Sequence, residues 1–173
     1  IMKSVIKNTN NLLFFDKKIT LRLQKLANKS EKKRSRICCH LSTRNKINEM
    51  VIYLMKKSYV RPHIHPHNKS ESYTILKGRM KIFVFDKFGK VKKIIEMGDI
   101  NSGKNFFYRM SNSFWHMPIA FDSDCIYHET YCGPFRKNKD VKYAPWAPKE
   151  SDAKEIKIFL NKIKYMKILV TGG

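Results

Sequence analysis

The sequence predicts an all-β fold, a small barrel or jelly roll, with a helix packed on either side of it. Between residues 36 and 132, short apolar runs alternate with turn residues at regular spacing, which is typical of antiparallel sheets. Residues 86–90 (DKFGK) are a hairpin signal between two of these runs. Before and after this region, apolar residues recur at helical spacing instead.

The first predicted element is an amphipathic helix over residues 17–28. Ile19, Leu23 and Leu26 recur on one face, and basic residues occupy the other faces. Asp16 is a candidate N-cap and Asn28 a candidate stop. We expect this helix to close one side of the barrel.

Strands are expected at residues 36–40, 50–55, 60–65, 72–77, 79–85, 91–97, 105–110, 114–119 and 124–132. Residues 134–148 are rich in proline and aromatic side chains and cannot continue a sheet regularly. We expect them to wrap across its exterior and bury Phe135 and Trp146. A closing helix is expected over residues 149–163, with Ser151 as its candidate cap.

A chain of 173 residues suits one domain with short extensions. We expect a helical extension over residues 1–35, the β-barrel over 36–148, a helix over 149–165 and a separate tail over 166–173. No apolar run has membrane-spanning length and no signal peptide is recognisable, so we expect no membrane insertion and a cytoplasmic location. The four cysteines lack CxxC spacing and fit free thiols in a reducing compartment.

Four residues, His63, His65, Glu71 and His116, are candidate ligands of one divalent ion. Residues two apart on a strand share a face, so His63 and His65 can reach the same ion. Glu71 follows a predicted turn at residues 66–69 and can return to that face on the next strand. A set of imidazole nitrogens and a carboxylate suits divalent Zn, Fe, Mn, Ni or Cu.

The spacing H-x-H-x5-E-x6-G, which ends at Gly78, resembles the first motif of the cupin superfamily. Lys57 stands where that motif has its leading glycine. The run that leads into His116 resembles the second motif, but Ser111 and Ser113 replace its proline and glycine. This resemblance implies a small jelly-roll barrel with the metal inside it.

Six segments between residues 19 and 159 are similar, in order, to the WbuC family of cupin-fold metalloproteins: SYVRPHIH, SESYTILKG, VFDKFGKV, YRMSNSFWH, HETYCGPF and APWAP. These small bacterial proteins are often encoded in O-antigen and capsule loci. The resemblance implies a metal-binding cupin of lipopolysaccharide or other surface-polysaccharide biosynthesis. Its expected cofactor is one divalent transition metal (Zn, Fe, Mn or Ni), and its expected ligand is a nucleotide sugar.

Other candidate site residues follow from strand parity and from charge. Tyr73 shares the face of Glu71, so its phenol is expected to line the pocket. His128 and Glu129 face opposite sides of their strand, and the resemblance favours Glu129 as the inward residue, in a catalytic or a structural role. We therefore predict Tyr73 and Glu129 as catalytic residues. Arg36 and Arg61 are the candidates for binding an anionic substrate.

The net charge of +22 raises the question of nucleic-acid binding. Residues 29–36 form a compact basic run, but lysine is abundant throughout, and no helix-turn-helix, zinc-finger or RRM pattern is present. We therefore expect no specific nucleic-acid partner and instead a positive field that attracts a phosphorylated small molecule. A homodimer remains open.

Residues 166–173, MKILVTGG, resemble the opening strand and first glycines of an extended short-chain dehydrogenase, the superfamily of nucleotide-sugar epimerases and dehydratases. The glycine motif is unfinished, so NAD binding by this chain is not expected. The start of a fused domain, a neighbouring reading frame and a chance apolar tail remain alternatives.

Three functions fit these observations. The first is an epimerase or isomerase of a nucleotide sugar, in which the metal polarises a carbonyl group. The second is a non-catalytic module that binds a sugar nucleotide or stabilises a partner, with a structural metal. The third is an Fe(II)-dependent dioxygenase, which the ligand set also allows. Four protein ligands without water would favour a structural metal, and an exchangeable water would favour chemistry.

Overall fold

The computed structural model describes residues 4–56, 58–111 and 113–164. Residues 166–173, the segment that resembles the start of a dehydrogenase, lie outside the described residues. None of the described helices combines the length and the apolar character needed to cross a membrane.

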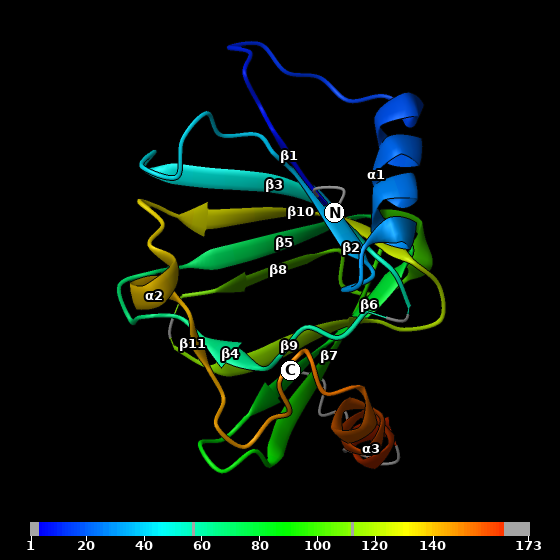
Figure 1. Cartoon of the computed structure of the whole chain (residues 1–173), viewed down its shortest axis with the longest axis vertical. Coiled ribbons are helices and arrows are strands. Elements are labelled where there is room, and N and C mark those ends of the chain that lie inside the picture. The colour runs from blue at the N-terminus through cyan, green and yellow to red at the C-terminus, as the bar shows by residue number, and fades with distance from the viewer. Residues whose placement is uncertain (1–3, 57, 112, 165–173) are drawn as a thin grey trace.

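Two β-sheets face each other and form the body of the molecule (Figure 1). The first sheet has the strand order β1 (Val5–Lys7), β2 (Arg34–Cys38), β3 (Ile47–Leu54), β10 (Cys125–Cys132), β5 (Glu71–Lys77) and β8 (Phe107–Met110). The second has the order β11 (Lys142–Tyr143), β4 (His63–Ile64), β9 (Trp115–Ala120), β6 (Arg79–Phe85) and β7 (Val91–Gly98). Only the β1–β2 pair is parallel among these pairings, so the predicted all-β fold of antiparallel strands is confirmed.

Most predicted strands are present within two or three residues of their expected ends. The largest difference is β4, expected over residues 60–65 but formed only by His63–Ile64. Pro62 has no N–H group for a sheet ladder, and the carbonyls of Tyr59 and Arg61 accept side-chain hydrogen bonds instead. The short strands β1 and β11 were not predicted, because two or three residues carry too little periodicity.

Helices flank the sheets as expected. Helix α1 (Lys17–Lys29) begins at Asp16, whose carboxylate accepts from the backbone N–H groups of Lys18 and Ile19. It ends after Lys29 rather than at Asn28. Helix α3 (Ala153–Lys164) is capped by Asp152, not by Ser151, because the Asp152 carboxylate accepts from the N–H of Glu155. Two short elements, α2 (Lys137–Asp140) and the 3₁₀ helix η1 (Ile100–Ser102), were not predicted.

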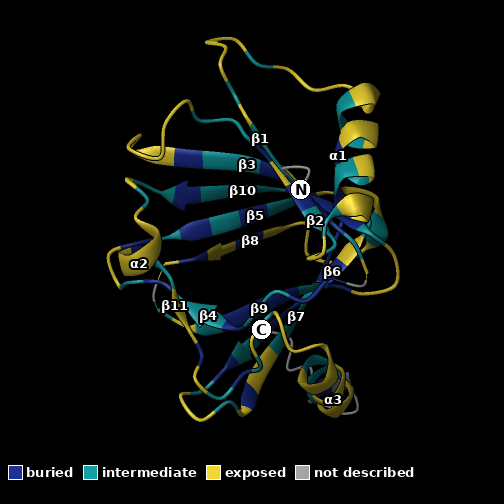
Figure 2. Cartoon of the chain, viewed as in Figure 1, coloured by how far each residue is buried: buried dark blue, intermediate teal, exposed yellow. Residues whose placement is uncertain are grey.

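Apolar side chains pack in three layers. The strands of both sheets carry many of the buried residues, coloured dark blue in Figure 2. The inner layer fills the space between the sheets, with Ile52, Ile82 and Met97 among its members. Leu23 and Ala27 of α1 cover the outer face of the first sheet. On the outer face of the second sheet, α3 and Trp146 pack against Phe85 and its neighbours, with the Trp146 and Phe85 rings 5.0 Å apart. Trp146 therefore packs on the exterior as predicted, but Lys142–Tyr143 join the edge of the second sheet as β11. Phe135 and Trp146, both expected to be buried, are only partly buried.

Gly78 joins β5 to β6 at a position that only glycine fills without strain. Its φ is +83°, and a Cβ there would lie 2.2 Å from the backbone oxygen of Asp124. We expect Gly78→Ala to lower the free energy of unfolding by about 2–5 kcal/mol, since the left-handed strain adds to an overpacking penalty.

Gly103 supplies a matched control. Its φ is +68°, but a Cβ there would meet no atom within 4 Å. Gly103→Ala should therefore lower the free energy of unfolding only by the cost of the left-handed backbone conformation, about 1–2 kcal/mol. Urea denaturation of both variants measures the difference, and equal losses would show that the Asp124 contact has no effect.

Candidate metal centre

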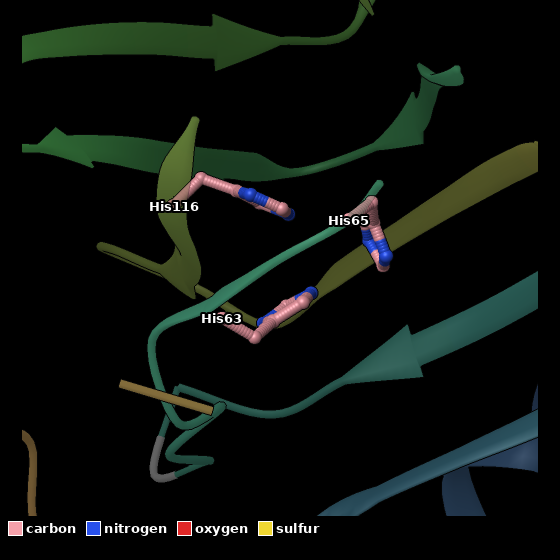
Figure 3. Close-up of side chains that lie close together, drawn as sticks. All are labelled: His63, His65 and His116. Carbon is pink, nitrogen blue, oxygen red and sulfur yellow. The ribbon is translucent and has the colours of Figure 1, made fainter. Parts of the chain in front are cut away.

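The four predicted ligand residues come together between the two sheets. His63 on β4 is paired directly with His116 on β9, and His65 follows β4 immediately. Ligand atoms of the three histidines all lie within 4.8 Å of one another, and the rings converge on one point (Figure 3). Glu71, the first residue of β5, approaches two of these rings from the opposite sheet. Its carboxylate oxygens lie 3.2 Å from His65 Nε2 and 3.0 Å from His116 Nε2.

Each of the three imidazoles is oriented by a backbone carbonyl. The Nδ1 atom lies 3.0 Å from the Arg61 oxygen in His63, 2.6 Å from the Asp140 oxygen in His65, and 2.9 Å from the Phe114 oxygen in His116. A carbonyl can only accept, so Nδ1 carries the hydrogen in each ring. In a neutral ring the lone pair is then on Nε2. Histidine metal ligands usually have this tautomer, with the other ring nitrogen donating to a carbonyl or a carboxylate.

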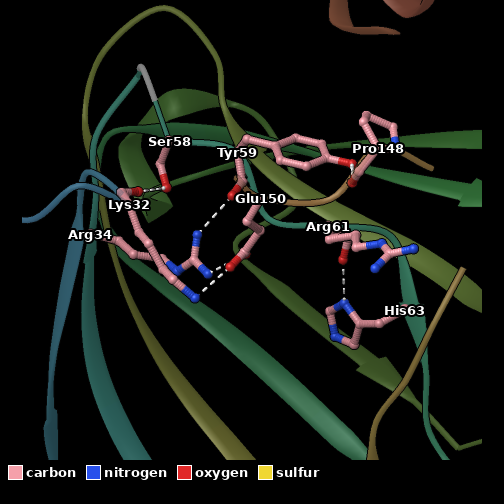
Figure 4. Close-up of polar contacts among 8 residues, drawn as sticks. All are labelled: Lys32, Arg34, Ser58, Tyr59, Arg61, His63, Pro148 and Glu150. Carbon is pink, nitrogen blue, oxygen red and sulfur yellow. Dashed lines mark hydrogen bonds and ion pairs between the residues drawn. The ribbon is translucent and has the colours of Figure 1, made fainter. Parts of the chain in front are cut away.

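The carbonyl that orients His63 belongs to a segment held from several sides (Figure 4). The Ser58 hydroxyl donates to the Lys32 carbonyl over 2.7 Å, and the Tyr59 hydroxyl donates to the Pro148 carbonyl over 3.1 Å. A guanidinium nitrogen of Arg34 donates to the Tyr59 carbonyl over 2.7 Å. These contacts hold the segment before β4 although it forms no regular strand.

His65 is held by α2 and by the loop before β9. The carbonyl that accepts from His65 belongs to Asp140, whose own carboxylate accepts from the backbone N–H of Arg136 over 2.6 Å. The ring of Tyr131 lies 4.9 Å from the His65 ring. The Ser113 hydroxyl donates to the His65 carbonyl. The serine that replaces the motif glycine therefore anchors the backbone of a candidate ligand.

Electrostatics in the cluster favour a cation at its centre. Burial would raise the pKa of the Glu71 carboxyl, but His116 and His65 outweigh burial and hold that pKa well below its usual range. Burial, together with His116 and His65, lowers the pKa of His63 well below its ordinary value. Burial also lowers the pKa of His65, but Glu71 more than offsets this and leaves it raised. A proton on His65 facing Glu71 therefore takes the place that a cation would occupy.

The cluster passes a direct test of fit to a metal. Glu71 Oε1 and His116 Nε2 are both buried and lie 3.0 Å apart. Among the described residues neither atom has a hydrogen-bond partner, and buried polar atoms in this state are rare. A divalent transition ion held by three imidazole nitrogens and one carboxylate oxygen would satisfy both atoms.

Comparison with known proteins places the fold. Residues 15–97 match the model of a family described as a domain of unknown function, DUF6016. No curated protein sequence matches the chain. Cellulomonas parahominis L-ribose isomerase is similar in structure, with a TM-score of 0.52 and 9% identity over 70% of this chain and 72% of its own. Protein SO0799 from Shewanella oneidensis has a TM-score of 0.49 and 11% identity over 62% and 72% of the two chains.

An oxalate oxidase solved with the substrate analogue glycolate has a TM-score of 0.43 and 12% identity over 58% of this chain. The match spans 47% of the oxidase, about half its length. Identities this low show the fold alone. The chain has a cupin-like jelly-roll fold, and a histidine cluster that could hold a metal lies between its sheets.

The predicted catalytic residues face the interior beside the candidate ligands. Tyr73 lies two residues after Glu71 on β5, and its hydroxyl donates to Glu71 Oε2 over 3.3 Å. Glu129 is directly opposite Tyr73 in the pairing of β10 with β5. His128 points to the outer face, where its Nε2 lies 3.5 Å from a Glu49 carboxylate oxygen. Burial, and next the Glu71 charge, raise the pKa of Glu129 to about 7.

The two predicted arginines occupy different environments. Arg36 is exposed on β2 directly opposite Ile52, a member of the inner layer, so its side chain leaves the sheet on the inner face. The Arg61 guanidinium instead donates to the Ala144 carbonyl over 2.7 Å and lies 5.5 Å from the centre of the Tyr143 ring. Arg61 thus links the segment before β4 to Tyr143 of β11 and to Ala144. Of the two arginines, only Arg36 lies on the face of Glu129.

Sequence reasoning missed several residues around the cluster. Lys69 is only 8% exposed and donates to the carbonyls of Gly133 and Pro134, but a lysine in a predicted turn carries no signal of burial. The backbone carbonyl of Asp140, which accepts from His65, could not be recognised from the sequence either. Tyr127 could have been found, because strand parity places it on the same face as Glu129.

Proposed function

We propose that this chain is a metal-dependent cupin of bacterial surface-polysaccharide biosynthesis that acts on a nucleotide sugar as an epimerase or isomerase. The resemblance of its sequence segments to the WbuC family supports the biosynthetic context. The net charge of +22 supports a negatively charged, phosphorylated ligand.

One observation carries the reaction type. A carboxyl group with a pKa raised to about 7, on Glu129, lies on the same inner face as a buried cluster of three histidines and Glu71. Glu71 and Glu129 are diagonal neighbours across β5 and β10, so two carboxyls of very different acidity lie side by side. In such a pair one carboxyl, Glu71, stays ionised and can bind a metal. The other, Glu129, can take up and release a proton near neutral pH.

His63, His65, Glu71 and His116 would hold the metal, which would supply Lewis acidity toward the carbonyl oxygen of a keto-sugar nucleotide. Glu129 in its carboxylate form would take a proton from the carbon next to that carbonyl. An epimer forms when the same carbon regains a proton from solvent on its opposite face and Glu129 releases its proton to solvent. An isomer forms when Glu129 returns the proton to the former carbonyl carbon while the neighbouring hydroxyl proton passes to the former carbonyl oxygen. The substrate and product then differ only in where or on which face this hydrogen is attached, so no oxidant or reductant is needed. A pKa near the working pH makes both transfers accessible.

Tyr73 would act as a hydrogen-bond donor rather than as a base. Burial, followed by the charges of Glu71 and Glu129, raises the pKa of Tyr73 well above its ordinary value, so the phenol keeps its proton. Its hydroxyl already points at Glu71 Oε2. A neutral phenol at this place can stabilise negative charge that develops on a sugar oxygen.

A second candidate function is supported by the burial of most of the cluster, in which only His63 is partly exposed. The side chains of His65, Glu71 and His116 are 8%, 1% and 0% exposed. Four protein ligands that leave little room for water are typical of structural metals. The chain would then bind a sugar nucleotide, or stabilise a partner enzyme, without turnover.

Exchange of carbon-bound hydrogen separates the two functions. Metal-loaded protein is incubated in heavy water with a panel of uridine- and thymidine-diphosphate sugars that includes 4-keto-sugars, and deuterium in the sugar is measured by mass spectrometry. Binding with incorporation at one carbon is the expected result, and chelator-treated protein should show none. Binding without incorporation would favour the binding module, and absence of binding to every member would exclude both.

A further inference from the structure

The inner face of the first sheet carries four polar groups next to the candidate metal ligands. Glu129 lies opposite Tyr73 in the β10–β5 pairing, and Tyr73 lies opposite Tyr108 in the β5–β8 pairing. Tyr127 lies two residues from Glu129 on β10 and therefore shares its face. The Tyr73 ring is 5.0 Å from that of Tyr127 and 5.5 Å from that of Tyr108. Three phenols and a carboxyl thus form one continuous wall.

Most of this wall lacks hydrogen-bond partners. Tyr127 is 3% exposed and Tyr108 is 8% exposed. The Tyr108 hydroxyl is buried and has no hydrogen-bond partner within the part of the chain that the structure describes. Among the described residues, neither the Tyr127 hydroxyl nor the Glu129 carboxyl takes part in a hydrogen bond. Because buried polar groups are almost always paired in native proteins, the Tyr108 hydroxyl calls for a partner that is not among the described residues. The Tyr127 hydroxyl and the partly buried Glu129 carboxyl are available to the same partner.

The charge along this face changes from the centre to its edge. Glu71 and Glu129 place two carboxyl groups near the middle of the sheet, where a phosphate would meet like charge. Arg36 lies at the β2 side of the sheet, exposed and forming no ion pair with any described residue. An arginine in this state can grip phosphate oxygens with its planar fork of donors.

We propose that Tyr127, Tyr108 and Glu129 form a subsite for the hydroxyl groups of a sugar ring, with the diphosphate of the same ligand at Arg36. This inference rests on the proposed function. It orients the nucleotide sugar with its sugar ring toward the candidate metal ligands and its diphosphate toward the β2 side of the sheet. Sugar hydroxyls both donate and accept, so they can satisfy a carboxyl and two phenols together. The aromatic rings offer apolar surface to the C–H face of the sugar. The subsite selects an uncharged, polyhydroxylated ring.

Calorimetric titration with UDP-glucose and with UDP tests the subsite. Metal-loaded wild type should bind UDP-glucose about tenfold more tightly than UDP, since several hydrogen bonds of modest net strength are gained. Tyr127→Phe should weaken UDP-glucose binding about three- to tenfold, the effect of one lost hydrogen bond, and leave UDP binding unchanged. Arg36→Gln should weaken both ligands by the same factor.

Tyr53→Phe is the matched control, because Tyr53 lies on the outer face of the same sheet and its hydroxyl donates to Asp124 over 2.9 Å. It should change neither affinity. Equal affinity of wild type for UDP-glucose and UDP, or a Tyr127→Phe variant with wild-type affinity for both, would overturn the subsite even if hydrogen exchange occurs. The expected affinities without hydrogen exchange would support the subsite and remove the epimerase. Failure of wild type to bind either nucleotide would also overturn the subsite.

Discussion

Replacement of His63 and His65 together by alanine is expected to abolish metal binding. The double substitution removes two of the three imidazoles whose Nε2 atoms face the centre of the cluster. What remains is one imidazole and one carboxylate, too few donors for a tight site. Elemental analysis of purified wild type should give one divalent transition ion per chain, and the variant should contain less than about a tenth of that.

Stability supplies a second readout of the same site. A ligand present at a thousand times its dissociation constant stabilises the folded state by about 4 kcal/mol, so a chelator should lower the melting temperature of wild type. The chelator should have no effect on the double variant. His40→Ala/His128→Ala is the matched control, because both histidines lie outside the cluster, near Glu49. Equal metal content in wild type and in the His63→Ala/His65→Ala variant would remove the central claim.

Glu129→Gln is expected to slow deuterium exchange into the sugar by about a hundredfold or more, the usual contribution of a general base. The amide keeps the shape of the side chain but cannot accept the proton. Glu49→Gln, which neutralises a carboxylate on the outer face of the same sheet, should leave exchange unchanged. A Glu129→Gln variant with wild-type exchange would assign the proton transfer to another group.

The same substitution should change how stability depends on pH. The pKa of Glu129 is raised from 4.5 to about 7 in the folded state, so the folded chain binds this proton more tightly than the unfolded chain. Its contribution is therefore most favourable below pH 4.5 and is lost as the pH rises to about 7. In metal-free protein at pH 8, Glu129→Gln should raise the free energy of unfolding by about 1–3 kcal/mol, with no gain near pH 4. Urea denaturation at both pH values measures this, and a gain independent of pH would contradict it.

Local sequence patterns were sufficient to predict the strand region, the helix that begins at Asp16 and the hairpin between β6 and β7. Each depends on interactions between residues close in sequence, such as a cap or a turn. Predictions of helix ends were less accurate. Asp152 rather than Ser151 caps α3, since two neighbouring residues can both accept from the first turn and the local backbone selects one.

For the site, the sequence determined which residues could act and which strand face they share. Strand parity put Tyr73 with Glu71 and separated Glu129 from His128, because successive side chains alternate between the two faces. The motif spacing likewise indicated three histidines and a glutamate as a ligand set.

Only the tertiary structure decided how these residues meet. It brought Glu71 from one sheet to within 3.2 Å of histidines from the other and supplied the Arg61, Phe114 and Asp140 carbonyls that fix the ring tautomers. It also engaged Arg61 with Ala144 while leaving Arg36 on the face of Glu129. These outcomes depend on contacts between segments far apart in the chain. Local periodicity says which face a side chain occupies, but not what lies opposite that face.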